Sequence, residues 1–518
     1  MDVSRLRDAW SRVFGLAWPV MAEQTFRTAM RTTDVLITAL FSPAAVVAIG
    51  LADLYARFPL RIGLGLGGGA IALSSQDTGA GVTDSRDEAV TQAILLGALA
   101  GLPFVLFGLR FGERAIDVFG RLVGEGTAPE VVALGSTYLA IVFATAPARH
   151  VALVAARALQ GTGDTRTPMY VNVAGNSANI AGSVLLGLGL FGLPRLEVVG
   201  VGLATAGANV LTAGLLCAAI WGPWTDASFA RPRDPTVASQ LLRVSAPRVV
   251  EGFGSELAEF PFNALLLGFG EPVNAGFQIG RRVYQQVTGP LSRGYNVAAS
   301  VLVGQALGAG DPEAARFNGW AVAGLGVLTV GAIGIGLVAA APRLVPAFTD
   351  DPETVTYAVD FARVYGVAGV ALVCFSALSG SLQGASETRI PLAARLSGML
   401  GFFVGLSWLL GRTAGVGPAG AYAGVLLAYA WMALVVAAGF RYTGWADRAD
   451  DLMAERGTAG GAAGTDSGAG DDSAESDGSE RTDDSAESDG SERTDDSAES
   501  DGSERTDDSA ESDGPGAT

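Results

Sequence analysis

The ten-residue stretch LQGTGDTRTP (Leu159–Pro168) returns 223 residues later as the related stretch LQGASETRIP (Leu382–Pro391). Two further matches keep nearly the same spacing: QDTGAG (Gln76–Gly81) with QALGAG (Gln305–Gly310), and Pro19 with Pro247. Matches in one order at one spacing indicate a duplicated unit of about 225 residues. Both copies are mainly apolar. A duplicated apolar unit is typical of membrane transporters whose substrate path lies between two repeats.

The duplicated body contains twelve apolar stretches long enough, at roughly 20 residues each, to cross a bilayer as helices. They lie near residues 13–40, 45–73, 89–111, 131–159, 168–193, 197–222, 241–269, 273–303, 318–341, 356–381, 390–411 and 417–440. We therefore expect an all-α integral membrane protein with twelve transmembrane helices in two six-helix repeats. The expected lobes are residues 10–222 and 241–444. Residues 223–240, whose prolines (Pro235 among them) interrupt the helical periodicity, are the expected cytoplasmic linker.

The C-terminal segment 457–518 differs in composition from the body. It consists mainly of Gly, Ala, Ser, Thr, Asp and Glu, and it repeats the block DDSAESDGSERT from Asp471 onward. It carries 20 of the chain's 52 acidic residues and 3 of its 34 basic residues, so it accounts for nearly all of the net charge of −18. With no apolar pattern to bury, it is expected to be disordered. The acidic tail and the absence of lysine suit a salt-loving organism.

The distribution of arginine predicts the orientation in the membrane. If the N-terminus is cytoplasmic, arginine is more frequent in the inner connections than in the outer ones, as the positive-inside rule requires. We therefore expect a multi-pass protein of the cell membrane with both termini in the cytoplasm. The first apolar stretch is too long for a signal peptide, so it is expected to serve as the insertion signal.

Histidine and cysteine are scarce, with one histidine (His150) and two cysteines (Cys217 and Cys374) that fall inside apolar stretches. This composition argues against a conventional metal cluster and a disulfide framework. No nucleophile–base pair is apparent, so we expect no catalytic residues and no enzyme. No cofactor beyond a coupling ion and no nucleic-acid partner is expected. The expected partners are small organic substrates and the lipid bilayer, with a monomer as the functional unit.

Over residues 10–444 these motifs resemble those of the multidrug and toxic compound extrusion (MATE) transporters, in their archaeal and bacterial proton-coupled branch. The motif residues that carry the resemblance include Pro19, Gly161, Gly163, Asp164, Pro168, Gln305, Gly308 and Gly384. The resemblance implies a two-lobe antiporter that exports organic solutes or drugs by alternating access, in exchange for protons or sodium. Local turn chemistry also explains the LQG motif. Gly161 and Gly163 end one helix, Asp164 or Thr165 caps the next, and Pro168 lies in its first turn.

Ionisable residues inside the spans are costly there and usually face a cavity or one another. In the first span Glu23, Arg27, Arg31 and Asp34 follow at intervals of four, four and three, which places them on one helix face. A stripe of alternating charge cannot face lipid. We expect it to line the cavity between the lobes or to neutralise charges on neighbouring helices.

The resemblance assigns ion coupling to an aspartate on the first helix and to polar groups on the fifth and sixth helices. The matching residues in this chain are Asp34, Asn179, Thr205 and Ser183. Ser183 stands where the resembling transporters have a second acid, so the two-carboxylate scheme does not carry over. The alternative interpretation of Asp34 is a static ion pair with Arg31 or Arg57.

Further charged residues of the spans are assigned, with the first-helix stripe, to a substrate or cation cavity. They are Asp53, Arg57, Glu256, Glu259, Arg281 and Arg282. Glu256 matches a glutamate that sodium-coupled members of the resembling family use, and the alternative is an ion pair with Arg281 or Arg282. The many arginines suit an anionic or zwitterionic substrate as well as a cationic drug.

Two other functions fit part of the pattern. A flippase for lipid-linked sugars, from the same structural superfamily, would use an arginine-lined cavity to hold a pyrophosphate. A non-transporting receptor or scaffold would use the acidic tail as its binding module. Ionisable groups inside both halves favour a transporter over a scaffold.

Overall fold

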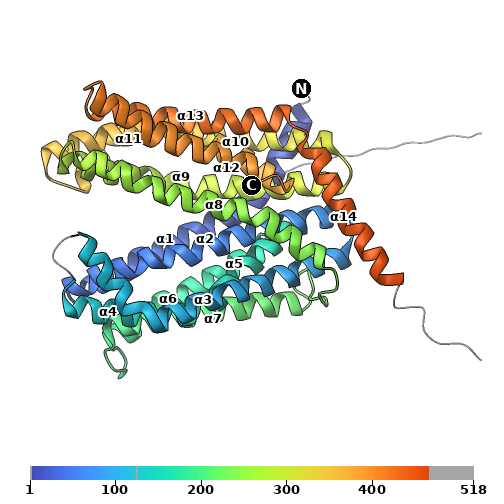
Figure 1. The fold of residues 1–518 in the computed structure, drawn as a ribbon, viewed down its shortest axis with the longest axis horizontal. Coiled ribbons are helices and arrows are strands. Elements are labelled where there is room, and N and C mark those ends of the chain that lie inside the picture. The colour runs from blue at the N-terminus through green and yellow to red at the C-terminus, as the bar shows by residue number, and fades with distance from the viewer. Residues whose placement is uncertain (1–2, 124–126, 466–518) are drawn as a thin grey trace, which may run out of the picture. The chain divides into compact units, whose positions relative to one another are not determined.

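The computed structural model describes residues 3–123 and 127–465, which form helices and short connections without strands and belong to one compact unit. The first half contains α1 (Val3–Ala39), α2 (Pro43–Ala80), α3 (Thr83–Val123), α4 (Pro129–Ala144), α5 (Ala146–Gly161), α6 (Arg166–Leu188) and α7 (Glu197–Trp221). The second half contains α8 (Pro235–Leu267), α9 (Glu271–Gly308), α10 (Pro312–Leu344), η1 (Val345–Ala347), α11 (Pro352–Gly384), α12 (Arg389–Ser397), η2 (Gly398–Leu406), η3 (Leu409–Thr413), α13 (Pro418–Tyr442) and α14 (Trp445–Thr465). Figure 1 shows α1–α7 as one lobe and α8–α13 as the other.

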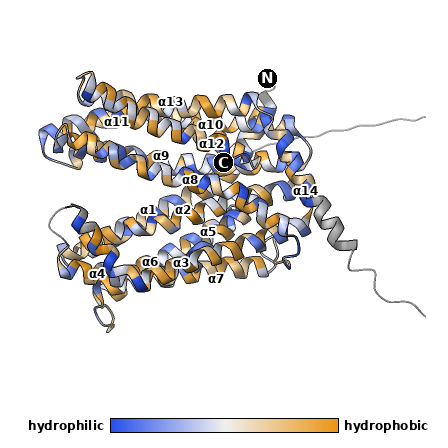
Figure 2. Ribbon diagram, viewed as in Figure 1, coloured by the Kyte–Doolittle hydropathy of each residue, from blue (hydrophilic) through white to orange (hydrophobic). Residues whose placement is uncertain are grey.

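The expected twelve-helix fold in two repeats is confirmed. Ten expected spans each correspond to one helix of the described chain, and the other two correspond to the consecutive segments α4–α5 and α12–η2–η3. Among the described residues, seven helices are long and apolar enough to cross a membrane, and the bent pair α4–α5 makes an eighth. The other four spans, α1, α6, α8 and α9, carry polar and charged residues along their length. Apolar residues follow the long helices, and hydrophilic residues are most frequent toward the helix ends (Figure 2).

Two spans depart from a straight α-helix. The fourth span bends by 50° at Thr145, between α4 and α5. Pro147 lies in the first turn of α5, where a proline tolerates the missing backbone donor but prevents continuation of the preceding helix. The eleventh span begins as α12 and continues through η2 and η3, which are wound as π-helix. Sequence periodicity predicted the spans but neither irregularity.

The expected linker 223–240 is too long, because α8 begins at Pro235. The Asp234 carboxylate accepts a hydrogen bond from the Thr236 backbone N–H at 2.7 Å, and Pro235 occupies the first helical turn. A proline at this position starts a helix instead of breaking one. At the other end, α14 extends to Thr465, so the first nine residues of the segment expected to be disordered are helical. The rest of that segment, 466–518, lies outside the described residues.

The first helix of each repeat starts in the hydrophobic core of the other lobe. Val13 and Ala17, in the N-terminal part of α1, belong to the core formed by α8–α13, and the Trp10 Nε1–H donates to the Ala321 carbonyl of α10 at 3.1 Å. In the same way, Leu241 and Val244 of α8 pack into the core formed by α2, α3, α5 and α7. This exchange buries apolar side chains of each half in the other. It ties the lobes together at the end where α1 and α8 begin.

At that same end the duplicated motifs contact each other across the lobes. Gln76 Nε2 of the first lobe donates to the Gly384 carbonyl of the second at 2.8 Å. Gln305 Nε2 of the second lobe donates to the Gly161 carbonyl of the first at 3.3 Å. A Cβ at Gly308 would collide with the Gln76 carbonyl, so α2 and α9 approach this closely only with glycine. We call these two reciprocal contacts the glutamine clasp.

The LQG motif has the expected turn geometry. α5 ends at Gly161, and Gly163 has a φ of 98°, a left-handed conformation that glycine adopts without strain. The Asp164 carboxylate accepts from the backbone N–H groups of Arg166 at 3.0 Å and Thr167 at 2.9 Å, so Asp164 caps α6. Pro168 lies in the first turn of α6. The motif therefore has a structural role in its own lobe and a second one in the clasp.

α14, which follows the last span, adds hydrogen bonds to the glutamine clasp. Arg456, only 5% exposed, donates from Nη2 to Asp77 Oδ1 at 2.9 Å and to Gln76 Oε1 at 3.1 Å. Its Nη1 donates to Gln240 Oε1 of α8 at 2.7 Å. One guanidinium thus binds the C-terminal end of α2 in the first lobe and the beginning of α8 in the second. The sequence interpretation missed this residue, because it lies beyond the last span at the edge of the acidic segment.

We predict that Arg456→Ala lowers the free energy of unfolding by about 3 kcal/mol, because it leaves the buried Asp77 carboxylate without a cation. Thermal unfolding of the detergent-solubilised protein measures this loss. Truncation after Arg456 is the matched control, and it should leave the melting temperature unchanged, since it keeps the guanidinium. Equal melting temperatures for Arg456→Ala and the intact chain would contradict the role given to α14.

Candidate functional site

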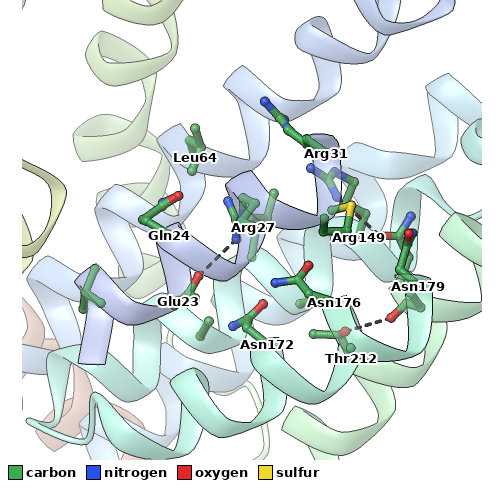
Figure 3. A pocket seen from close by; sticks show the side chains of 18 of the residues that line it. Glu23, Gln24, Arg27, Arg31, Leu64, Arg149, Asn172, Asn176, Asn179 and Thr212 are labelled. Carbon is green, nitrogen blue, oxygen red and sulfur yellow. Dashed lines mark hydrogen bonds and ion pairs between the residues drawn. The ribbon is translucent and has the colours of Figure 1, made fainter. Parts of the chain in front are cut away.

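A cavity of about 70 Å³ lies in the first lobe, between α1, α2, α5, α6 and α7, and reaches Arg293 of α9 in the second lobe. In Figure 3 the charged stripe of α1 faces a row of asparagines on α6 across this cavity. The residues shown there include Glu23, Arg27, Arg31, Asn172, Asn176 and Asn179. The asparagines recur at intervals of four and three, so they share one face of α6. Glu23, Arg27 and Arg31 line this first-lobe cavity, whereas the stripe was expected to line the cavity between the lobes or to neutralise charges on neighbouring helices. Glu23 is buried and binds Arg27 Nη2 at 3.1 Å.

Asp34 lies at the end of a hydrogen-bonded chain that joins three helices. The Ser183 hydroxyl donates to Asp34 Oδ1 at 2.9 Å and lies 3.4 Å from Asn179 Oδ1. Asn179 Nδ2 in turn donates to Thr205 Oγ1 of α7 at 3.1 Å. The four residues assigned to ion coupling are therefore adjacent in the structure, and Asn179 and Thr205 also line the cavity. Ser183, in place of a second acid, is the direct partner of the carboxylate.

The alternative partners expected for Asp34 are not found in the described residues. Arg31 lies within electrostatic range of Asp34 and Asp53 but forms an ion pair with neither. Arg57 points to the other lobe. Asp53 is exposed and lies outside the residues that line the cavity. Asp34 is thus held by a neutral hydroxyl, and its charge has no guanidinium in contact.

Glu256 is bound by the opposite lobe, which corrects the expected pairing with Arg281 or Arg282. Its Oε2 accepts from Arg57 Nη1 at 3.1 Å, and its Oε1 contacts Arg61 Nη2. Arg281 instead binds Glu259 at 2.6 Å within the second lobe. The expectation was wrong because it considered only neighbours within one repeat, whereas α8 packs along α2. Arg282 is exposed and does not line the cavities at the lobe interface.

A second cavity, of about 260 Å³, lies between the lobes and adjoins the first. Residues of α2, α5, α8, α9, α11 and α12 surround it, and Arg157 and Arg293 line both cavities. Glu251 of α8 is buried beside it and binds Arg248 at 2.9 Å and Arg395 at 3.3 Å. Sequence interpretation passed over the roles of Arg157, Arg248 and Arg395. The rule that intramembrane charges face a cavity would have found all three.

His150 has a packing role in the first lobe. Its Nδ1 lies 2.8 Å from the Ala146 carbonyl, and its ring stacks on Phe104 with a centroid separation of 6.1 Å. No group of three or more potential metal ligands occurs within the described ranges. Among the described residues, the site offers two kinds of group. One is the hydrogen-bonded chain that begins at the Asp34 carboxylate, and the other is the excess of arginines at the lobe interface.

We predict that Glu256 is energetically coupled to Arg61 and not to Arg281. A double-mutant cycle with Glu256→Gln and Arg61→Gln should give a coupling of about 1 kcal/mol in unfolding free energy, since these side chains are partly exposed. Glu256→Gln and Arg281→Gln should be additive. Glu259→Gln with Arg281→Gln serves as the matched cycle within one lobe. Coupling of Glu256 to Arg281 alone would overturn the inter-lobe assignment.

Comparison with known proteins gives matches over both lobes. The family model MatE matches residues 19–185 and 249–409. A probable multidrug resistance protein NorM from Bradyrhizobium diazoefficiens is 29% identical over 436 residues, covering 81% of this chain and 91% of that protein. A probable multidrug resistance protein NorM from Rhodopseudomonas palustris is 30% identical over 434 residues, covering 79% and 87%.

Solved structures with the same fold include two that match with a TM-score of 0.76 over 85% of this chain and 96% of theirs. One is a transporter of the MOP superfamily from Pyrococcus furiosus, 20% identical, described in the words "reverse polarity of binding pocket suggests different function". The other, 19% identical, is an outward-facing multidrug resistance MATE family transporter of that superfamily. With a family model that matches more than half of its length, one segment in each repeat, the chain belongs to the MATE family of multi-pass membrane transporters.

Proposed function

We propose that this protein exports small organic solutes or drugs in exchange for protons, by exposing the cavity between its lobes alternately to the two sides of the membrane. The observation that carries the proposal is the chain from Asp34 through Ser183 and Asn179 to Thr205, which connects a membrane-embedded carboxylate to the cavity of the first lobe. That cavity adjoins the one between the lobes. Sodium is the alternative coupling ion, and it would replace the proton at the same carboxylate.

The hydrogen bonds at Asp34 support a proton switch. In the ionised state Ser183 donates to the carboxylate. A protonated Asp34 becomes a donor to the Ser183 hydroxyl, and the Ser183 proton then turns to Asn179 Oδ1, already 3.4 Å away. Protonation thus reverses the direction of donation along α6 and removes a negative charge from α1. Because α1 carries Pro19 and begins in the core of the other lobe, a change at Asp34 has a route to the lobe interface.

The contacts between the lobes support alternating access. The clasp and Arg456 hold the lobes together at the end where α1 and α8 begin, and Glu256 holds α8 to α2 farther along the span. The start of α1 and the start of α14 both contact the first turns of α10. With both termini in the cytoplasm, as the arginine distribution favours, the clasp faces the cytoplasm and the cavity opens outward.

We propose a monomer in the cell membrane as the transporting unit, with no cofactor other than the coupling ion. A flippase for lipid-linked sugars is the alternative that one specific observation favours, namely the arginines of the inter-lobe cavity. A receptor or scaffold role for the acidic tail has no comparable support.

The proposal is tested with proteoliposomes loaded with a pH-sensitive dye. Addition of a transported solute should move protons through the intact protein, and Asp34→Asn should abolish this movement while the protein stays folded and inserted, since asparagine resembles the protonated acid and cannot titrate. The solutes tested are ethidium as a cation and carboxyfluorescein as an anion. A sodium-sensitive dye in parallel vesicles identifies the coupling ion.

Ser183→Ala is the matched control for the hydrogen-bonded chain. It keeps the titratable carboxylate, so coupled transport should persist with a changed pH profile. If Asp34→Asn moves protons at the rate of the intact chain, Asp34 is a structural residue and the coupling scheme is wrong. If no solute moves protons or sodium through the intact protein, the antiport proposal itself fails.

A further inference from the structure

The inter-lobe cavity has a strong excess of positive charge. Its lining residues include five arginines and one glutamate: Arg61, Arg157, Arg248, Arg293, Arg395 and Glu251. Both lobes contribute, since Arg61 and Arg157 come from α2 and α5 and the others from α8, α9 and α12. Charges inside a membrane protein are retained where they are paired or where they face a ligand or ion path. The pairing of each arginine therefore decides what the cavity can bind.

Three of these arginines have carboxylate partners and two have none. Glu251 binds Arg248 and Arg395, and Glu256 binds Arg61. Arg157 and Arg293 form no ion pair within the described part of the chain. Arg157 donates to the neutral Gln160 Oε1 at 3.1 Å. Glu23, within electrostatic range of both arginines, is in contact with Arg27.

The wall next to Arg293 also holds hydrogen-bond donors without acceptors. Arg293 Nε is buried and has no partner, and neither has the hydroxyl of its neighbour Ser292. Ser379 of α11 lines the same cavity, is 1% exposed, and its hydroxyl is unpartnered as well. Leaving a buried donor unsatisfied costs free energy that a bound acceptor would return. The cavity therefore has two arginines without an ion pair in its lining, and residues with unsatisfied hydroxyl groups in its wall.

We propose that this cavity binds the anionic group, a carboxylate or a phosphate, of the transported substrate between Arg157 and Arg293; the inference rests on the proposed transport function and specifies its substrate class. Guanidinium groups bind both kinds of anion through paired, charge-assisted hydrogen bonds. Ser292 and Ser379 supply further donors. A cationic solute would meet two unneutralised like charges at the same place, where the low dielectric strengthens the repulsion.

The position of the two arginines also connects binding to the transport cycle. Arg157 belongs to the first lobe and Arg293 to the second, and both border the two cavities. An anion that contacts both guanidiniums draws the lobes together, because their repulsion is removed only while it is bound. Separation of the lobes would leave the anion in contact with one arginine. The protein therefore binds the anion more tightly with the lobes together than with the lobes apart, and transport requires such a difference in affinity.

The test measures binding and transport of the same probes with the purified full chain. Carboxyfluorescein binding is followed by fluorescence anisotropy, and we expect Arg157→Gln and Arg293→Gln each to weaken it about tenfold, the effect of losing one charged hydrogen-bond donor. Arg157→Lys, which keeps the charge, should weaken binding less than Arg157→Gln. Arg343→Gln, an exposed arginine of α10 outside both cavities, is the matched control and should bind as the intact chain does.

Competition identifies the source of the anionic group. Inorganic pyrophosphate and a polyprenyl diphosphate are each added against carboxyfluorescein. Stronger displacement by the lipid diphosphate assigns the site to a lipid headgroup, and equal displacement assigns it to soluble anions. Each of these results supports an anion site between Arg157 and Arg293.

Other outcomes separate this inference from the antiport proposal. If ethidium moves protons through the intact protein and carboxyfluorescein neither binds nor moves, the antiporter stands and the anion site is wrong. If carboxyfluorescein binds in a manner that depends on Arg157 and Arg293 but no solute moves ions, the anion site stands and antiport fails. Binding that is unchanged in well-folded Arg157→Gln and Arg293→Gln, judged by thermal unfolding and monodispersity, also overturns the inference.

Discussion

The structure depends on a reciprocal hydrogen-bonded contact between its two repeats. Gln76 and Gln305 occupy matching positions, and each donates to a carbonyl in the LQG motif of the opposite lobe, at Gly384 and Gly161 respectively. A single duplicated pair of motifs therefore makes the same contact twice. In a bilayer such polar contacts have few competing partners, although the net stabilisation from each is modest. The exchange of the first helices of the two repeats adds apolar burial at the same end.

The cost of placing charges inside a membrane explains where the ionisable residues lie. Twelve spans with ionisable residues can insert only if these residues face one another or an internal space. Ion pairs account for Glu23, Glu251, Glu256 and Glu259, and several of these pairs join different helices. Among the ionisable residues that these ion pairs leave over are Asp34, with a hydroxyl partner, and Arg157 and Arg293, without a carboxylate. To these three we assign coupling and substrate binding.

Sequence alone predicted the helical spans, the duplication and the cluster around Asp34, because apolar length, repeated motifs and a family resemblance are all local signals. It did not predict partners across the lobes. Glu256 was paired with the wrong arginines, and Arg456 was missed, because their partners on α2 are close only once α8 and α14 pack against it. Pro235 was read as a helix breaker since its meaning depends on the Asp234 cap. The bend at Thr145 was missed although Pro147, a local signal, follows it closely.

In the proposed transport cycle the glutamine clasp must open for substrate to cross. Ala80 and Ala309, exposed residues on either side of it, are replaced by cysteine in a chain without Cys217 and Cys374, and joined with a short reducible crosslinker. Solute transport by the crosslinked protein in proteoliposomes is then compared before and after reduction. Crosslinking should stop transport, because it keeps the lobes together at the clasp, and reduction should restore it. Transport at the full rate while the lobes remain crosslinked would contradict the proposed cycle.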